Sequence, residues 1–545
     1  KAQAKADLAK QIADVSEIIR SIVKNRLGSD AAREYVMVDR VPDLPFFWRA
    51  LQWARPGGRI AFAMHARLIF KQFQAGQIAQ RALFDAVRVT GILNGAAIRN
   101  TEVWPKVSAP FCLVFAENER PTQDSAFYFV SPELEASLNR YGRVRVDAKA
   151  AQPVSISMLR KRPTLLKTLF RGTSLDAAVI EKINDSTKGV PLKAYWESMN
   201  LNSGDGYQLG TNGTIPDPKY EWQKLGELTA WENLGTGCTI AHEQLPRFNK
   251  KRVYRLHSRD IYRGPLVLVS ESPSTQRDKC RVVLSWEDIV FSESFIGYSC
   301  HGHPQAKMLA RYLLIVLNSD FVLYHTLMTS SKFGVEREAL LKEDIEQLPI
   351  IPFEKLPIDY HCDINRISDA LLTSGIEALP AVNRWVAKIY ALDRWDLETI
   401  EDTLSVSLPF SDNKRRAQLR PTNTEVSAFA RRVESEIAPF LTQFGSNVTS
   451  RVQVDSLESP WIFVKLSGTS LGRASAPVSA DRHIPEFIKE ADECGSSQIF
   501  VHEGNSVLIG ILGQYRYWTP TRARLCALDI LHDQQSALLA TEEKM

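Results

Sequence analysis

The sequence predicts an α/β protein whose first sheet is the last part of a doubly wound sheet. Three observations favour this class. A helical pattern that ends at Pro56-Gly57-Gly58 is followed by a short apolar run, helix and strand patterns then alternate up to residue 116, and a separate strand-rich block begins at Gly264. At 545 residues the chain is long enough for about three or four domains.

Helix and strand patterns alternate in the first block. Apolar residues recur at helical spacing in 44–54, and the glycines that follow end that helix. The next run is short, apolar and bounded by a turn, as in a buried strand. We expect helices over 1–28 and 44–54, a strand over 59–64, a helix over about 70–84, and strands over 87–93 and 109–116.

The rest of the chain divides at changes of composition. Prolines and basic residues replace the regular patterns after Arg120, strands return in 264–300, and Pro349 and Pro352 mark a linker. We expect strands over 265–270 and 281–285, helices over 304–330 with a break near 318–320, helices over 356–445, strands over 461–466, 498–501 and 506–512, and a last helix over 520–542. The predicted domains are the end of the first α/β domain in 1–145, a mixed α/β domain in 146–355, a helical accessory region in 356–445 and a small α+β domain in 446–545.

The composition is that of a soluble globular chain. Hydrophobic residues make up 44% and charged residues 24%, and no apolar run reaches the roughly 20 residues that span a bilayer. The seven cysteines are scattered and form no CxxC pair, and no signal-peptide pattern precedes the first helix. We therefore expect a cytoplasmic location, no membrane segment, and a true N-terminus upstream of Lys1.

Charge is balanced overall and concentrated locally. The formal net charge is +4, whereas the stretch from Arg140 to Arg171 holds nine basic residues and one acid, Asp147. Such a stretch fits a phosphate backbone or an ordinary solvated surface equally well. The only metal-like pattern, Cys300-His301-Gly302-His303, has no second half at ligand spacing and is interpreted as a polar loop.

Two motifs occur in a fixed order in the first block. The helix with 46–51 (FFWRAL) leads into 55–59 (RPGGR), and 101–109 (TEVWPKVSA) places an aromatic–proline pair just before the last strand. In kind and in order, these motifs resemble the gamma-type adenine-N6 DNA methyltransferases, a family that includes many restriction-modification enzymes. The resemblance implies a Rossmann-like catalytic domain, with its C-terminal part in 1–145, followed by a target-recognition domain that binds double-stranded DNA. Where many relatives have Pro after the strand, this chain has His65.

The resemblance assigns Trp104, with Pro105 after it, to the family's base-stacking position. A methyltransferase can reach the amino group of a base only after rotating the nucleotide out of the duplex, so it must replace the lost stacking. A flat aromatic side chain does this with roughly 1 to 3 kcal/mol per stacked base. The alternative is that Trp104 is a core aromatic at the edge of a sheet.

Basic residues of the second domain are the candidate DNA contacts. Phosphate contacts set the register of a protein on DNA, and arginine can also read guanine in the major groove. The alternative is that each is a plain surface charge. The candidates are Arg247, Lys250, Lys251, Arg252, Arg255 and Arg263.

The chemical motifs of the family are missing from these 545 residues. The catalytic motif pairs a polar residue with Pro-Pro and an aromatic, yet no Pro-Pro dipeptide occurs. The cofactor motif, a strand that ends in a glycine-rich turn around S-adenosylmethionine, has no counterpart ahead of Phe46. The glycine-containing loop over 204–213 follows no apolar strand and is interpreted as part of the recognition domain. We therefore expect the S-adenosylmethionine site to lie mostly outside this chain, so that a missing N-terminal half or a complementary subunit completes the enzyme.

Two other functions remain open. One is a non-catalytic DNA-binding specificity subunit, which would need neither Trp104 nor a methyltransferase strand order. The other places an endonuclease in 356–545, but the acids Asp481, Glu486 and Glu490 show no PD-(D/E)xK spacing on a strand. We favour the methyltransferase.

Overall fold

The computed structural model divides the chain into two compact units. The first unit comprises Lys1–Thr173, Ser405–Leu408 and Asn413–Met545, and the second comprises Ser174–Leu404 and Pro409–Asp412. The residues described are 2–38, 42–147, 150–185, 189–209, 213–230, 237–272, 280–453, 459–470, 484–493 and 495–539. Within these ranges, no helix has the length and apolar character needed to cross a membrane.

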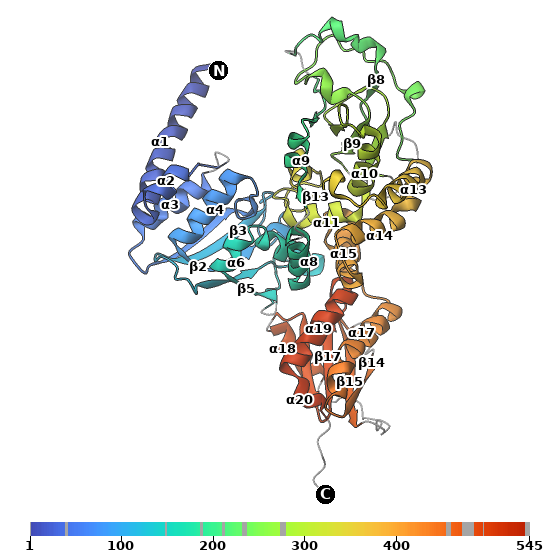
Figure 1. Ribbon diagram of the computed structural model, residues 1–545. Coiled ribbons are helices and arrows are strands. Elements are labelled where there is room, and N and C mark those ends of the chain that lie inside the picture. The colour runs from blue at the N-terminus through green and yellow to red at the C-terminus, as the bar shows by residue number, and fades with distance from the viewer. Residues whose placement is uncertain are drawn as a thin grey trace. The chain divides into compact units, whose positions relative to one another are not determined.

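The first unit begins with an α/β sheet that carries helices on one face (Figure 1). Its elements are α1 (Ala2–Leu27), α2 (Ser29–Glu34), α3 (Asp43–Trp53), β1 (Arg59–His65), α4 (Gln74–Ala86), β2 (Arg88–Asn94), β3 (Phe111–Glu117), β4 (Ala126–Val130), α5 (Ala136–Asn139), β5 (Gln152–Ser155), α6 (Ile156–Lys161) and α7 (Leu165–Arg171). The strand order is β1-β3-β2-β4-β5. Because β3 is antiparallel to both β1 and β2, and β2 is parallel to β4, the strands β1, β2 and β4 all point the same way.

A turn that is held by hydrogen bonds separates α3 from β1. Gly57 has a φ of 68°, a left-handed conformation that glycine adopts without strain. The side-chain amide of Asn118 donates to the carbonyl groups of Leu51, Ala54 and Arg55 at 3.1, 2.6 and 3.2 Å. The turn therefore holds the end of α3 against the end of β3.

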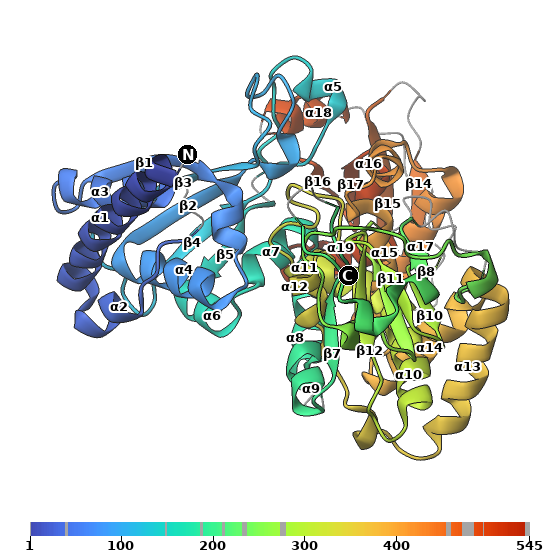
Figure 2. The same ribbon diagram turned by 90° about the horizontal axis from the view of Figure 1, so that it is seen from above.

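Apolar side chains attach the helices to the sheet. The rings of Phe47 on α3 and Phe62 on β1 meet edge to face with their centroids 5.8 Å apart. Helices α1, α3 and α4 lie on the same side of the sheet in both views (Figure 2). One face of the sheet is thus buried under helices.

The expected elements of this block are present with small shifts at their ends. The helix expected over 70–84 consists of a short 3-10 helix, Ala66–Phe70, and α4. The sequence did not predict β4 and β5. Because β5 pairs with β4, the first sheet extends past residue 145.

The second unit is a mixed α/β structure with several small sheets. Its elements are α8 (Ser174–Asp185), β6 (Val190–Pro191), α9 (Leu192–Ser198), β7 (Asn202–Asp205), β8 (Gly226–Leu228), β9 (Leu266–Ser270), β10 (Val282–Ser285), β11 (Ile289–Phe291), β12 (Phe295–Ser299), α10 (Ala306–Asn318), α11 (Asp320–Thr329), α12 (Lys342–Glu346), β13 (Pro349–Ile350), α13 (Tyr360–Ser374), α14 (Leu379–Ile389) and α15 (Arg394–Ser407). The largest sheet has the order β10-β9-β12-β7. The expected strands and the helix break at Ser319 are confirmed.

A disulfide joins Cys238 to Cys280, and Cys280 lies just before the first residue of β10. The two Cα atoms are 6.1 Å apart. The spacing of the cysteines along the sequence did not predict this pairing.

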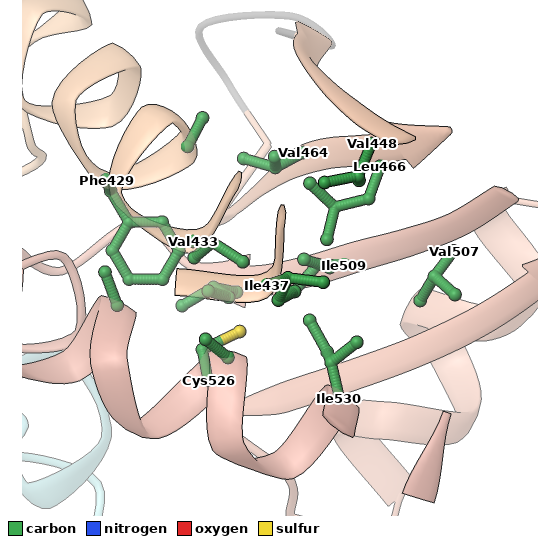
Figure 3. Close-up of a cluster of buried hydrophobic side chains, with 14 of the residues drawn as sticks. Phe429, Val433, Ile437, Val448, Val464, Leu466, Val507, Ile509, Cys526 and Ile530 are labelled. Atoms are coloured by element: carbon green, nitrogen blue, oxygen red, sulfur yellow. The ribbon is translucent and has the colours of Figure 1, made fainter. Parts of the chain in front are cut away.

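The C-terminal part of the first unit is an α+β structure with one more strand than expected. Its elements are α16 (Ser411–Gln418), α17 (Asn423–Thr442), β14 (Ser446–Gln453), β15 (Trp461–Ser470), α18 (Ile484–Glu493), β16 (Gln498–Glu503), β17 (Ser506–Leu512), α19 (Pro520–Asp533) and α20 (Gln535–Leu538). The strand order is β14-β15-β17-β16. Figure 3 shows the core between this sheet and its helices, in which Phe429, Val433 and Ile437 of α17 meet Ile509 of β17 and Ile530 of α19. β14 is the strand that the sequence did not predict.

Candidate functional site

The carboxyl ends of three parallel strands meet at one edge of the first sheet. His65 ends β1, Asn94 ends β2, and Ser131 directly follows β4. Asn94 connects two of these ends, because its Nδ2 donates to Ser131 Oγ at 3.1 Å and its Oδ1 accepts from the backbone N–H of Ala96 at 3.2 Å. Open α/β sheets bind their ligands at such an edge. A site is therefore expected here.

Phe111 begins β3 between these strand ends. It lies opposite His65 in the register, and its carbonyl accepts from the backbone N–H of Gly95 at 2.8 Å. Gly95 leaves room for the ring, since a Cβ at that position would lie 2.2 Å from ring atoms of Phe111. Trp104 packs edge to face on Phe111, with centroids 4.5 Å apart and an interplanar angle of 70°. The structure thus brings Trp104 to the carboxyl ends of β1 and β2.

A tight turn presents Trp104. Its carbonyl accepts from the backbone N–H of Val107 at 3.3 Å, with Pro105 and Lys106 between them. Lys106 has a φ of 65°, as the third residue of a type II turn requires, and proline suits the second position because its own φ is fixed. The backbone N–H of Asn100 donates to Val107 O at 3.1 Å and closes the loop. Trp104 is 37% exposed, so its side chain is not part of the buried core.

Polar groups next to this aromatic pair are held by hydrogen bonds. Asp43, the first residue of α3, accepts the backbone N–H of His65 through Oδ2 at 2.6 Å, and His65 Nδ1 accepts from the backbone N–H of Arg67 at 3.2 Å. Cys112 follows Phe111 and is fully buried. Burial, with the Asp43 carboxylate as the second cause, raises the pKa of the Cys112 thiol to about 12. Cys112 is therefore protonated near neutral pH and is not a thiolate nucleophile.

The residues of this edge do not by themselves fit S-adenosylmethionine. Among the described residues ahead of β1, the elements are the helices α1, α2 and α3, with no strand that ends in a glycine-rich turn. Such a turn is what allows the backbone to approach the cofactor.

Four of the six predicted DNA-contact residues have partners within the second unit. Lys250 Nζ lies 3.6 Å from the carboxylate of Glu227, whose side chain is only 4% exposed. Two of the arginines donate to backbone carbonyl groups: Arg247 to Lys224 O, and Arg252 Nη1 to Gly213 O at 3.1 Å. The third, Arg263, has its Nη1 3.1 Å from His301 Nε2 and 3.8 Å from Asp260 Oδ1. These four side chains support the fold of the loops around them.

The remaining two candidates, Lys251 and Arg255, are exposed. Within the described ranges, neither makes an ion pair or a side-chain hydrogen bond. The guanidinium of Arg255 lies over the ring of Tyr254, 5.4 Å from its centroid. Their charges are therefore available to a ligand.

The basic stretch 140–171 is partly used inside the first unit. Arg145 Nε lies 3.2 Å from Glu135 Oε1, and Arg160 Nη2 lies 2.6 Å from Asp85 Oδ1. Lys167 is only 1% exposed. These three residues are not free to follow a phosphate backbone.

The Cys300-His303 loop is held by separate partners. Cys300 is buried, His301 faces Arg263, and His303 Nε2 lies 2.8 Å from Glu354 Oε1. The two histidines thus contribute to different contacts.

Sequence reasoning missed Gly95, Phe111 and Tyr254. Gly95 and Phe111 are brought together by strand register, which no local pattern encodes. Tyr254 carries a usable signal, because it is the one aromatic inside a run that contains Lys251, Arg252 and Arg255.

No protein-family model matches the chain, and no curated protein matches it. Among solved structures, the chain is similar to the type IIG restriction endonuclease BpuSI, with 11% sequence identity and a TM-score of 0.27 over 66% of this chain and 50% of that chain. It is also similar to the type IIL restriction-modification enzyme MmeI in complex with DNA, with 9% identity and a TM-score of 0.36 over 66% of this chain and 52% of that chain. The chain spans about half the length of each.

Proposed function

We propose that this chain is the C-terminal portion of a DNA adenine-N6 methyltransferase of a restriction-modification or phage-defence system. In this proposal the first sheet is the C-terminal part of a Rossmann-like catalytic domain, and the second unit contains the domain that recognises double-stranded DNA. The complete enzyme transfers a methyl group from S-adenosylmethionine to N6 of an adenine that it has rotated out of the duplex.

The observation that carries the proposal is the position of Trp104. A half-exposed aromatic, fixed on Phe111 by a closed turn, stands at the carboxyl edge of a sheet with parallel strands. An extruded base needs a flat apolar partner, and stacking on an aromatic contributes about 1 to 3 kcal/mol. Trp104 would supply that partner, with Pro105 holding the turn that presents it.

The strand order supports a Rossmann-like origin of the sheet. A strand, β3, enters antiparallel between β1 and β2, which are themselves parallel and connected through α4. Parallel strands connected through a helix are the unit from which doubly wound sheets are built, and here β3 returns antiparallel between the two strands of that unit.

An exposed apolar face of the first sheet supports the inference that another part of the enzyme covers it. Across four neighbouring strands, Ala61, Phe115, Gly91 and Tyr128 lie side by side in register. Phe115 is 41% and Tyr128 62% exposed. Aromatic side chains that lie together on the exposed surface of a sheet mark a surface that another polypeptide segment or a partner contacts. We infer that an N-terminal half, or a complementary subunit, covers this face and supplies the Pro-Pro motif and the S-adenosylmethionine site.

The alternative function is a non-catalytic DNA-binding specificity subunit. The absence of any Pro-Pro dipeptide from the 545 residues favours this alternative. It assigns no role to the exposure of Trp104, and for that reason we prefer the methyltransferase.

Duplex DNA binding over a range of salt concentrations tests the proposal. The chain alone should bind duplex DNA with an affinity that falls steeply as salt rises, because each phosphate contact releases counterions. It should form no N6-methyladenine and should bind S-adenosylmethionine weakly or not at all. Methyl transfer by the chain alone, or failure to bind duplex DNA, would contradict the proposal.

A further inference from the structure

We propose that Arg255 reads a guanine in the major groove of duplex DNA and that Tyr254 positions it. This inference rests on the proposed function, because it takes duplex DNA as the ligand. Arg255 would act as the specificity-determining residue, and its neighbour Lys251 would contact phosphate.

The segment that carries these residues is strongly basic and firmly anchored. Residues 247–255 contain five basic side chains and no acid. Val253 is completely buried, and its backbone N–H donates to Thr214 O at 3.1 Å. Tyr254 exchanges two backbone hydrogen bonds with Gln208, at 2.6 and 2.8 Å. The backbone is therefore fixed up to the residue before Arg255.

The backbone then turns sharply at Arg255. Its φ of 54° lies in the left-handed region, which is unfavourable for a residue with a long side chain. Such strain persists where the surrounding structure imposes it, and it is concentrated at binding sites. Here the turn follows directly on the two hydrogen bonds that hold Tyr254.

Tyr254 offers the guanidinium a flat support. The Tyr254 side chain is 49% exposed, and Arg255 Cζ lies 5.4 Å from its ring centroid. Stacking restrains the guanidinium plane while its N–H donors, which point outward in that plane, stay free. Guanine presents O6 and N7 as a pair of acceptors in the major groove, which match two of these donors.

The other basic residues cannot take this role equally well. Lys250, Arg252 and Arg247 are engaged with Glu227, Gly213 and Lys224. Lys251 is free but carries a single compact charge on a flexible stem, which suits a phosphate better than a base edge. Within the described residues 247–255, only Arg255 combines a free planar guanidinium with an aromatic support.

The test begins with selection of preferred sites by the full chain from a library of duplexes with a randomised centre. Affinities are then measured by fluorescence anisotropy on the selected duplex and on two modified duplexes. In one, the preferred guanine is replaced by 7-deazaguanine, which lacks the N7 acceptor. In the other it is replaced by inosine, which lacks only the minor-groove amino group. The wild-type chain should lose about 5- to 150-fold in affinity on 7-deazaguanine and little on inosine.

The variants distinguish recognition of the guanine base from nonspecific electrostatic attraction to DNA. Arg255→Gly, which adopts the left-handed turn freely, should abolish the difference between guanine and 7-deazaguanine. Arg255→Lys should not restore it, Tyr254→Phe should keep it, and Tyr254→Ala should reduce it. Arg384→Ala, which removes an exposed arginine from α14 of the same unit, should change nothing.

Two results would overturn the inference and are distinct from failure of the proposed function. One is an Arg255→Gly chain that still discriminates 7-deazaguanine. The other is a loss of affinity in that variant that is equal on all duplexes, which would make Arg255 a phosphate contact. A wild-type chain that binds no duplex DNA would instead contradict the proposed function itself.

Discussion

At the residue scale, Trp104 depends on the small size of Gly95. The ring of Phe111 occupies the space where a side chain at Gly95 would begin, and Trp104 packs on that ring. The φ of Gly95 is −88°, which any residue can adopt. A glycine is therefore required at this position by the close approach of the Phe111 ring and not by the backbone conformation.

Gly95→Ala is therefore expected to displace Phe111 and, through it, Trp104. Overpacking of this kind typically costs about 1 to 3 kcal/mol of unfolding free energy. Chemical denaturation measures the cost, and the fluorescence of the displaced indole reports the shift. Gly91→Ala is the control for stability, because a Cβ there would meet its neighbours only at ordinary contact distances, 3.7 Å from Tyr128 O and 3.9 Å from the ring of Phe115. Unchanged stability in Gly95→Ala would contradict the packing described.

The carboxyl group of Glu271, which directly follows β9, has a shifted pKa. Partial burial is the first cause that raises its pKa to about 7, and the carboxylates of Asp205 and Glu293 add to it, while Arg337 opposes it. A folded-state pKa above the unfolded value means that this group stabilises the fold at low pH. That contribution is lost as the pH rises from about 4.5 to about 7.

Glu271→Gln should accordingly stabilise the protein above pH 7, by on the order of 1 kcal/mol after allowance for solvent screening. At pH 4.5 the variant and the wild type should be similar, because the carboxyl group is then largely protonated in the folded state. Melting temperatures across this pH range test the expectation. A variant that is less stable than wild type at pH 8 would show that the charge of Glu271 is useful to the fold.

The sequence identified individual candidate residues but not the neighbouring groups that hold them in place. Trp104 and the free pair Lys251 and Arg255 were named from the sequence. Sequence alone could not distinguish Arg255 from Arg252, because the difference lies in a carbonyl, Gly213 O, that only the fold brings near.

At the element scale, the exposed face of β1, β3, β2 and β4 is the least usual feature of the first sheet. In the proposed complete enzyme this face is covered. In the isolated chain it should bind a hydrophobic dye and favour self-association.

The double variant Phe115→Gln, Tyr128→Gln should reduce dye binding and self-association of the isolated chain with little change in its melting temperature, because both side chains are exposed. It should also weaken assembly with the N-terminal portion. Dye fluorescence and analytical ultracentrifugation measure the two effects. Phe46→Gln, which changes a 55% exposed residue on α3, is the matched control. Equal effects of the control and the double variant would contradict a specific role for this face.

Elements with strong local signals were predicted, and those defined by pairing were not. β1, β2 and β3 follow clear turns or helices. β4 is five residues long and lies in a stretch whose prolines and charges indicate loops, while β5 has four residues and exists because β4 lies beside it. Short strands of this kind are stabilised by their neighbours, which are distant in sequence.

At the scale of the whole molecule, residues distant in sequence are joined within the first unit. Arg516, after β17, is 7% exposed as a side chain; its guanidinium lies 2.9 Å from Glu133 Oε2 and donates to Leu134 O at 2.7 Å. Arg145 Nη1 donates to Ser496 O at 3.0 Å, and the backbone N–H of Ser497 donates to Asp147 Oδ2 at 2.9 Å. The segment after β4 is thus tied to the C-terminal α+β structure.

Arg516→Ala should therefore destabilise the first unit by about 1 to 3 kcal/mol, because it removes a buried guanidinium that donates to Leu134 O and pairs with the partly exposed carboxylate of Glu133. Calorimetry should show the loss and a separation of the C-terminal structure from the rest of the unit. Lys489→Ala, which removes a 79% exposed side chain from α18, should have no such effect. A wild-type-like transition in Arg516→Ala would show that these contacts do not couple the two parts.

The decisive measurement is N6-methyladenine formation by this chain joined to the N-terminal portion that the proposed function requires. The joined protein should methylate adenine in duplex DNA. Trp104→Ala should lower the rate by roughly 5- to 150-fold, the equivalent of 1 to 3 kcal/mol of lost stacking, and Trp104→Phe should retain most of it. Trp53→Ala, which removes a 69% exposed tryptophan on α3, should leave the rate unchanged. A joined protein that forms no N6-methyladenine, or a folded Trp104→Ala variant that methylates at the wild-type rate, would contradict the claim.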